Sequence, residues 1–423
     1  MIRLLRAVRP RLLALFAAER DKLRGATRLA AVLAFLLINP GSLQAWWFFH
    51  HNSPHPQKTV IDSPLVVVPG QVISHYMIVT AKWDRRGPYH FLIDTGAATT
   101  LVSPLIARRY GIPMRDNATG KNLSVPVRSS EGEVSELPAV MVRQIDFGDA
   151  HFENLPALIY DCTQISLHLG VQIDGILGFT FFRNVLLTLD YPGRRIVLAP
   201  PNSASALQPG STIHFNNSQH VPIIPLGLGN KTFFALVDSG SDSTLRLNPL
   251  GMDFVYSQPP RPGPFVSSLS GDHQQTVARL DQTVLLGAYR LDHPVAEITS
   301  ELPAIGGAVL KDFIVTFDQK QNQVTFYRES TLPILFPPLR SAGFSVAKAG
   351  AYWKVVGIIS DSPAARAGVE EGDLITRINQ EPVDKWGSER YAHLVETAKT
   401  ITFAFLVGRR EYEIPLGVMD LVP

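Results

Sequence analysis

Two stretches of the chain repeat one pattern. Phe91–Thr100 reads FLIDTGAATT, and Phe234–Leu245 reads FALVDSGSDSTL. In each stretch a short apolar run ends in an aspartate, which a hydroxyl-bearing residue and a glycine follow. The two aspartates, Asp94 and Asp238, stand 144 residues apart. This internal repeat limits the possible folds more than any other feature, because two similar halves predict two similar lobes related by a pseudo-twofold axis.

A second pair of similar segments supports the repeat. Gly175–Leu198 and Pro303–Phe326 align at an offset of 128 residues, so each half also contains an apolar-apolar-glycine element and a later hairpin. Short runs of Val, Ile, Leu, Phe and Thr alternate with turn residues, which favours β-strands. We therefore expect an all-β fold with an N-terminal lobe over 59–200 and a C-terminal lobe over 201–330. The turn-rich segment Pro201–Gly210 is the expected joint between them.

Both aspartates occupy positions that require a specific reason. Phe91–Ile93 is typical of a buried strand, and a carboxylate at the edge of a core is costly unless something holds it. A pseudo-twofold axis brings Asp94 and Asp238 together, and two carboxyls in contact share one proton. The charged carboxylate can activate a water as a general base, and the protonated one can act as a general acid. We therefore expect peptide-bond hydrolysis that needs neither a metal nor a cofactor.

The motifs resemble those of the aspartic proteases. Asp94-Thr95-Gly96-Ala97 precedes Ile176-Leu177-Gly178, and Asp238-Ser239-Gly240-Ser241 precedes Ala304-Ile305-Gly306. The chain is most similar to bacterial retropepsin-like proteins with two fused lobes, and the resemblance covers roughly residues 60–330. It implies two pseudo-symmetric acid-protease β-barrel lobes with a catalytic cleft between them.

The resemblance also implies roles for single residues. These are the catalytic Asp94 and Asp238, the cross-bracing Thr95 and Ser239, and the supporting Gly96, Gly240 and Ser241. The two turns are not equivalent, because Ala97 lacks the hydroxyl that Ser241 offers. We expect Ser241 to hydrogen-bond Asp238 and to lower its pKa, which leaves Asp94 as the proton holder. The alternative is that both turns are relics of a β-barrel pair used for binding or dimerisation.

A different pattern begins after the second half. Short strands and helix candidates over 338–423 predict a separate small domain. Its segment Ser362–Asp373, SPAARAGVEEGD, resembles part of a PDZ domain. That resemblance implies that an extended peptide adds as a strand, with its terminal carboxylate in the loop of Ala342, Gly343 and Phe344. The alternative is a packing module that only stabilises the two lobes.

The N-terminus is typical of a targeting signal. Residues 1–45 carry eight Lys or Arg and two acidic residues, and the uncharged run Leu29–Ile38 precedes a plausible cleavage site after Ala45. We expect a signal peptide or an N-terminal membrane anchor over 1–45, followed by a linker over 46–58. Cys162 is the only cysteine, so no internal disulfide forms. An exported protein without a disulfide favours a bacterial periplasm.

Together these patterns predict an exported aspartic endopeptidase that hydrolyses polypeptides as a monomer, periplasmic and either soluble or membrane-anchored. The formal net charge is +2, of which the first 45 residues contribute +6. The rest therefore carries −4, which gives no electrostatic basis for binding nucleic acid. The PDZ-like domain would select or position the substrate. The alternative is a non-catalytic periplasmic scaffold that binds peptides through the PDZ-like domain.

Overall fold

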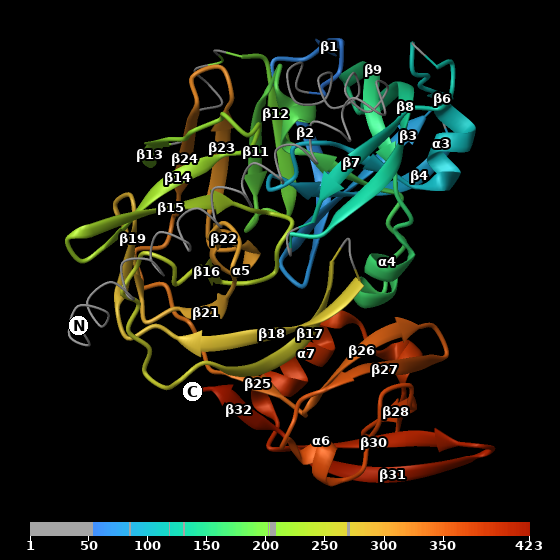
Figure 1. Cartoon of the computed structure of the whole chain (residues 1–423), viewed down its shortest axis with the longest axis vertical. Coiled ribbons are helices and arrows are strands. Elements are labelled where there is room, and N and C mark those ends of the chain that lie inside the picture. Colours follow the sequence, from blue (N-terminus) through green and yellow to red (C-terminus); the bar gives the residue numbers. More distant parts are fainter. Residues whose placement is uncertain are drawn as a thin grey trace, which may run out of the picture.

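The computed structural model describes residues 54–83, 86–117, 119–129, 132–201, 203, 209–268 and 271–423. The predicted signal or anchor over 1–45 lies outside these residues, as does most of the predicted linker. Figure 1 shows two β lobes side by side and a smaller domain of strands and short helices beneath them. The expectation of an all-β fold is confirmed. Within the described residues, no helix is long and apolar enough to cross a membrane.

The first lobe is a set of short strands with two short helices and one 3-10 turn. Its elements are β1 (Lys58–Ile61), β2 (Val66–Ile73), β3 (Tyr76–Trp83), β4 (Arg86–Asp94), β5 (Leu101–Val102), α3 (Pro104–Tyr110), β6 (Gly111–Pro113), β7 (Ser124–Arg128), β8 (Val134–Phe147), β9 (Ala150–Ile159), α4 (Thr163–Leu169), β10 (Gly175–Gly178), η1 (Phe179–Phe182), β11 (Leu186–Asp190) and β12 (Arg195–Ala199). We placed Lys58 in the linker, but it begins β1, which pairs with β9 opposite Glu153. The first lobe thus starts one residue earlier than we predicted from the sequence.

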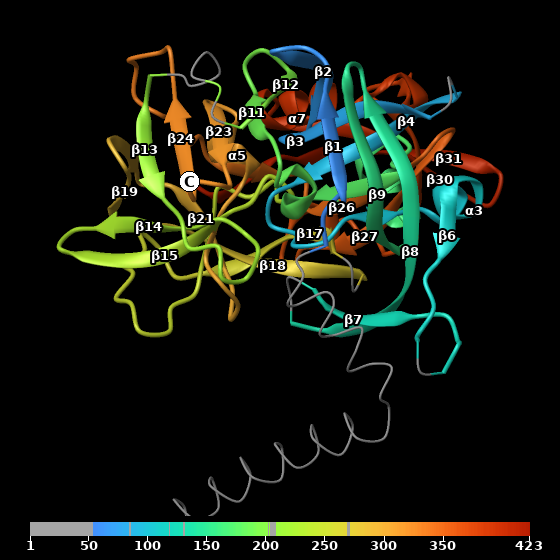
Figure 2. The ribbon, with the colours of Figure 1, turned by 90° about the horizontal axis from the view of Figure 1, so that it is seen from above.

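The second lobe repeats the first with fewer helical residues. Its elements are β13 (Ser211–His214), β14 (Ile223–Leu228), β15 (Lys231–Val237), β16 (Leu245–Leu247), β17 (Arg261–Ser268), β18 (Gly271–Arg279), β19 (Thr283–Leu286), β20 (Tyr289–Asp292), β21 (Val295–Ile298), β22 (Ala304–Ile305), α5 (Gly307–Leu310), β23 (Ile314–Asp318) and β24 (Gln323–Tyr327). Figure 2 shows β14 and β15 on the side of the molecule opposite to β8 and β9.

The same arrangement of three paired strands positions each aspartate. In the first lobe β10 runs parallel to β4 and antiparallel to β5, so that Gly178 lies opposite Asp94. In the second lobe β22 runs parallel to β15 and antiparallel to β16. Phe91–Ile93 of β4 and alternate residues of β15 (Phe233, Ala235 and Val237) are buried, and each strand ends at its aspartate turn. Two lobes of one topology therefore present their turns in equivalent places.

A continuous sheet joins the lobes. Strands β11 and β23 pair antiparallel with Thr188 opposite Thr316, and the two hydroxyls lie 2.9 Å apart. The strand order across this region is β13-β24-β23-β11-β12-β2. Thr188 and Thr316 are equivalent positions of the repeat, and they meet face to face as a twofold axis requires. The boundary at 200/201 therefore divides the chain but not the sheet.

The C-terminal domain has its own apolar core. Its elements are β25 (Leu339–Ser341), β26 (Phe344–Ala349), β27 (Tyr352–Ile358), α6 (Pro363–Arg366), β28 (Leu374–Ile378), β29 (Glu381–Pro382), η3 (Val383–Lys385), α7 (Ser388–Thr397), β30 (Thr400–Val407), β31 (Arg410–Gly417) and β32 (Met419–Val422). The sheet order is β26-β27-β28-β30-β31, with β25 and β32 paired separately. Phe344, Trp353 and Phe403 are buried together in this core.

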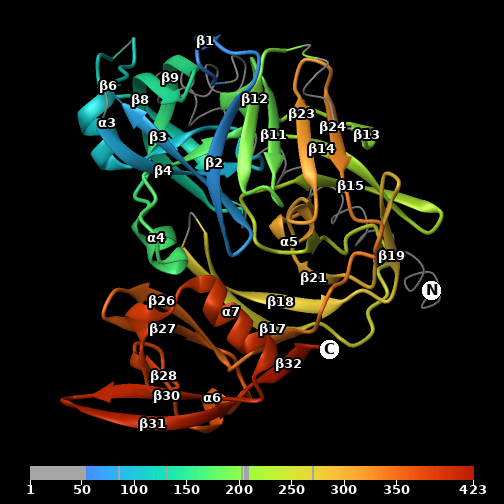
Figure 3. The ribbon, with the colours of Figure 1, turned by 180° about the vertical axis from the view of Figure 1, so that it is seen from behind.

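The hairpin β17–β18 lies between the lobes and the C-terminal domain (Figure 3). The Phe265 N–H donates to Ser345 Oγ over 2.9 Å, and His168 Nε2 of α4 lies 3.0 Å from Asp272 Oδ1 of β18. Leu421 and Val277 share a buried apolar cluster that crosses from β32 to β18. This hairpin therefore packs the C-terminal domain against the second lobe, and the His168–Asp272 contact joins the same hairpin to the first lobe.

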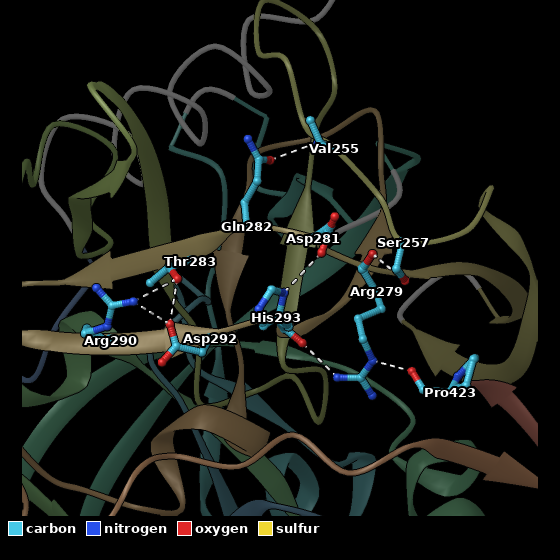
Figure 4. Close-up of polar contacts among 10 residues, drawn as sticks. All are labelled: Val255, Ser257, Arg279, Asp281, Gln282, Thr283, Arg290, Asp292, His293 and Pro423. Carbon is cyan, nitrogen blue, oxygen red and sulfur yellow. Dashed lines mark hydrogen bonds and ion pairs between the residues drawn. The ribbon is translucent and has the colours of Figure 1, made fainter.

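Arg279 at the end of β18 joins three segments, and Figure 4 shows its contacts with two of them, at His293 and Pro423. Its guanidinium donates to the backbone oxygens of His293 at 2.7 Å, Phe336 at 3.0 Å and Pro337 at 3.1 Å, and also to that of Pro423. The partners belong to the second lobe, to the proline-rich connection and to the last residue after β32. This side chain fixes the connection and the C-terminal strand pair against the second lobe.

Candidate active site

Each aspartate accepts hydrogen bonds from its own turn. Asp94 Oδ1 accepts from the Gly96 and Ala97 N–H groups at 2.9 and 3.0 Å. Asp238 Oδ1 accepts from the Gly240 N–H at 2.9 Å. Glycine at the third position lets the backbone fold back under the carboxyl. The turns therefore hold both carboxyl groups in fixed orientations at the base of the two lobes.

Thr95 and Ser239 connect the two turns. Thr95 Oγ1 donates to the Val237 carbonyl at 2.6 Å, and Ser239 Oγ donates to the Ile93 carbonyl at 2.8 Å. Each hydroxyl also accepts the backbone N–H of the other residue at 3.0 Å. Both side chains are fully buried, so these four bonds are sheltered from water. This is the cross-bracing that the resemblance implied.

The structure brings the two carboxyl groups into contact. An added Cβ on Gly96 would overlap the Asp238 carboxyl, and one on Gly240 would overlap the Asp94 carboxyl. Each carboxyl thus packs against the glycine of the opposite turn, and a hydrogen bond joins Asp94 to Asp238. Only glycine leaves space for this arrangement.

Different groups shift the pKa values of the two carboxyl groups. Burial, and then the charge of Asp238, raise the pKa of the Asp94 carboxyl to about 8. Burial also raises the pKa of Asp238, but the positive charge of Arg246 opposes that rise. The bond between the carboxyls raises the pKa of Asp94 and lowers the pKa of Asp238. These influences favour the proton on Asp94 and the charge on Asp238.

The expected role of Ser241 is wrong. Its hydroxyl lies 2.8 Å from Ser243 Oγ and accepts the Ser243 N–H, so it caps its own loop. It is not among the groups that shift the pKa of Asp238. The charge that most lowers the pKa of Asp238 is instead that of Arg246, which the sequence reasoning missed. Arg246 stands in an apolar strand with no motif around it, so no local signal marked it.

Other titratable side chains missed by the sequence reasoning surround the pair. Burial and the charges of Asp242, Asp238 and Asp94 raise the pKa of Tyr76, the first residue of β3. Burial raises the pKa of Asp242 to about 6 and lowers that of His75 to about 4. His75 Nδ1 lies 3.2 Å from the Asp242 carbonyl oxygen. Between about pH 4 and pH 6, His75 and Asp242 are therefore both uncharged.

Within the described residues, no group of three or more His, Cys, Asp or Glu side chains is placed to hold a metal ion. Two family models match the chain. The aspartyl protease model matches residues 79–181, which include the Asp94 turn and Gly178. The PDZ domain model matches residues 354–400. The chain fuses an aspartyl protease domain to a PDZ domain.

No curated protein matches the chain. The aspartyl protease match ends before Asp238, so the second half of the site rests on the internal repeat and on the contacts described above. The protease match indicates a peptidase, and the PDZ match is consistent with a polypeptide partner.

The PDZ loop predicted to receive a carboxylate is partly occupied by its own contacts. Ala342 and Phe344 are buried, and the Gly343 N–H donates to Ser341 Oγ at 2.9 Å. Gly343 has φ of 104°, a conformation that favours glycine, and its carbonyl accepts from Ser362 Oγ. The loop that we predicted is therefore formed, with one of its N–H groups already paired.

The β26 strand beside α7 also contacts the protease. Lys348 Nζ of β26 donates to Ser388 Oγ of α7 at 2.5 Å and to the His168 carbonyl at 3.2 Å. Ser388 Oγ donates to the Leu169 carbonyl at 3.0 Å. The end of α4 in the first lobe therefore meets the PDZ domain where β26 and α7 lie together.

Proposed function

We propose that the protein is an aspartic endopeptidase that hydrolyses peptide bonds with a water held between Asp94 and Asp238. The observation that carries this proposal is the buried, hydrogen-bonded carboxyl pair, cross-braced by Thr95 and Ser239. A carboxyl pair that shares one proton supplies a general acid and a general base at one place.

In the proposed reaction, the Asp238 carboxylate takes a proton from the water while the water oxygen bonds to the carbonyl carbon. Asp94 gives its proton to the carbonyl oxygen, which leaves a neutral diol intermediate. Asp94 then takes back a proton from one hydroxyl, and the amide nitrogen receives the proton from Asp238. The C–N bond breaks, and a carboxylic acid and an amine leave. Every proton is returned, so the pair begins the next cycle in its starting state.

One chain supplies both aspartates, so we propose that the active form is a monomer. We also propose export to a bacterial periplasm, as soluble or membrane-anchored protein, because of the basic and then apolar N-terminus and the single Cys162. Nucleic acid has no part in this function.

We propose that the PDZ domain positions the substrate. β26 is the edge strand of its sheet, so an extended peptide can add to it. If the carboxylate of the peptide lies near Ala342–Phe344, the rest of the peptide runs along β26 towards Lys348. Lys348 contacts α4 of the first lobe, so the peptide would reach the protease there. Tethering there raises the effective concentration of the scissile bond at the cleft. The second candidate is a non-catalytic scaffold, which the loop and the edge strand favour equally.

The test is peptide hydrolysis by Asp94→Asn, Asp238→Asn and the double variant. Each single change removes the shared proton arrangement, so we expect turnover to fall by at least about a thousandfold. Because the two residues act as a unit, the double variant should be little worse than either single one.

Asp318→Asn is the matched control. Asp318 Oδ1 also accepts two backbone N–H groups, from Lys320 and Gln321, at a turn of the interlobe sheet. It should keep full activity. Hydrolysis that survives in both single variants would overturn the proposed mechanism and leave the scaffold as the better account.

A further inference from the structure

One layer of the repeat is apolar in the first lobe and charged in the second. Leu101 pairs with Ile176 on one side and with Leu158 on the other, and all three belong to one buried apolar cluster. In the second lobe Arg246 pairs with Ala304 and Glu297 in the same pattern. Ile176 and Ala304 each stand two residues before the glycine of their element. The two sets are therefore structural equivalents.

The charged layer is built rather than incidental. Arg246 has an exposed fraction of 8%, and its Nε lies 3.6 Å from Glu297 Oε2. Gln275 of β18 donates to the same Glu297 oxygen at 3.1 Å. The short side chain of Ala304 leaves the space that Ile176 fills in the first lobe. Burying an ion pair in place of an apolar layer does not by itself stabilise a fold, so a different role accounts for it better.

That role concerns the carboxyl pair. Arg246 is the largest influence that opposes the effect of burial on the pKa of Asp238. Strand register places the two residues close together, because Ala304 is paired with Arg246 on one side and with Leu236, two residues before Asp238, on the other. The position equivalent to Arg246 in the first lobe is Leu101, which carries no charge. The two halves of the repeat thus differ by a cation beside the second aspartate, and this difference favours the charged form of Asp238.

We infer that Arg246, held by Glu297 and Gln275, is a positioning residue that places the shared proton on Asp94 and keeps Asp238 as the charged carboxylate. This inference rests on the proposed function, because the assignment of acid and base has meaning only for a working pair. On this inference the two pseudo-equivalent aspartates have different roles, with Asp94 as the general acid and Asp238 as the general base.

Several other ionisable groups act on this region and enter the same balance. They are Asp94 at the end of β4, Tyr76 and His75 at the start of β3, Asp242 in the second turn, His273 of β18, Lys311 after α5, and Tyr191 after β11. None of them is altered in the Arg246 and Glu297 variants below, so a change in the pH profile of those variants reports on Arg246 and Glu297.

The test is the full chain with Arg246→Leu/Glu297→Leu, which copies the apolar layer of Leu101 and Leu158. Removing the cation raises the pKa of Asp238, so the acid limb of the kcat/KM–pH profile should move upward by about one pH unit. Arg246→Lys keeps the positive charge, so the acid limb of its profile should move by less than half as much as in the Leu/Leu variant. Arg377→Leu/Glu411→Leu is the control. It removes another Arg–Glu pair, 3.1 Å apart on the PDZ sheet, and should leave the kcat/KM–pH profile unchanged.

A second measurement separates this inference from the proposed function. Carboxyl-carbon NMR titration follows Asp94 and Asp238 directly, with Asp94→Asn and Asp238→Asn to assign the signals. In the wild-type chain Asp238 should lose its proton at lower pH than Asp94, and the gap should narrow in the Leu/Leu variant. If the double variant does not fold, Arg246→Gln takes its place and should also narrow the gap between the two titrations. An unchanged gap overturns the inference whether or not the protein hydrolyses peptides, whereas a lack of hydrolysis overturns only the proposed function.

Discussion

The carboxyl of Asp94 keeps its proton in the folded chain far above the pH at which an exposed aspartate loses it. Its pKa rises from an ordinary 3.8 to about 8, first through burial and then through the charge of Asp238. The folded state therefore binds more protons than the unfolded state between about pH 4 and pH 8. Stability falls as pH rises across this window. The arrangement that suits acid–base chemistry thus opposes folding at neutral pH.

Asp94→Asn should make the protein more stable at pH 8 than the wild type, with little gain at pH 4. Below the unfolded pKa both states carry the proton, so the penalty is absent there and is complete above the folded pKa. The amide oxygen of asparagine can still accept the Gly96 and Ala97 N–H groups. Thermal unfolding of both proteins across this pH range measures the difference.

Asp318→Asn serves again as the control and should show no gain that grows with pH. A gain in Asp94→Asn that is equal at pH 4 and pH 8 would contradict the assignment of the shared proton to Asp94.

Two equivalent hairpins of the repeat have different partners. In the first lobe β7–β8 crosses to the second lobe, where Arg128 Nη2 lies 2.9 and 3.0 Å from the Glu301 carboxylate oxygens. In the second lobe β17–β18 turns away and packs on the PDZ domain through Phe265. One hairpin is therefore tied across the two lobes, and the other carries the extra domain.

Arg128→Ala should release the tip of β7–β8 without unfolding the lobe. The side chains of Arg128 and Glu301 are 64% and 26% exposed, so we expect a loss of under about 1 kcal/mol in global stability. Amide hydrogen exchange in β7 should become up to about fivefold faster, because one local contact is lost.

The charge swap Arg128→Glu/Glu301→Arg restores the pair and should restore slow exchange. Exchange in β7 that remains unchanged in Arg128→Ala would show that strand pairing alone holds the hairpin.

At the scale of the whole molecule, the PDZ domain is fixed by contacts that lie far from its own core. Arg279 donates to backbone oxygens of His293, Phe336, Pro337 and Pro423, and Leu421 packs with Val277. Deleting the domain would uncover these surfaces, so a point change is the cleaner way to loosen it.

Arg279→Met keeps the aliphatic stem but loses the hydrogen bonds, which should cost about 2 kcal/mol. We expect the radius of gyration from solution scattering to increase and the 330–338 connection to be cut faster by a probe protease. Arg290→Met is the control, because Arg290 bonds only within β19–β20, to Thr283 and Asp292, among the contacts drawn in Figure 4. Equal scattering curves for Arg279→Met and the wild type would show that apolar packing alone holds the domain.

The sequence by itself determined the two lobes, the two aspartate turns and the separate C-terminal domain. These follow from local pattern: an apolar run that ends in Asp-Thr-Gly or Asp-Ser-Gly, its repetition at a fixed spacing, and a change of pattern after the second copy. Such signals lie within a few residues of one another, and so they can be read without knowing the fold. The cross-bracing by Thr95 and Ser239 followed from the resemblance for the same reason.

The sequence led us to expect the proton on Asp94, but only the tertiary structure identified Arg246 instead of Ser241 as the group behind it, and only the structure decided where the PDZ domain rests. Arg246, Glu297 and Gln275 come from three strands, and their contact depends on strand register, which one residue of slip would destroy. Ser241 carried the right chemistry but bonds Ser243, because the short loop turns its hydroxyl back on itself. Long-range side-chain contacts of this kind are set by packing between strands, and the local sequence carries no mark of them.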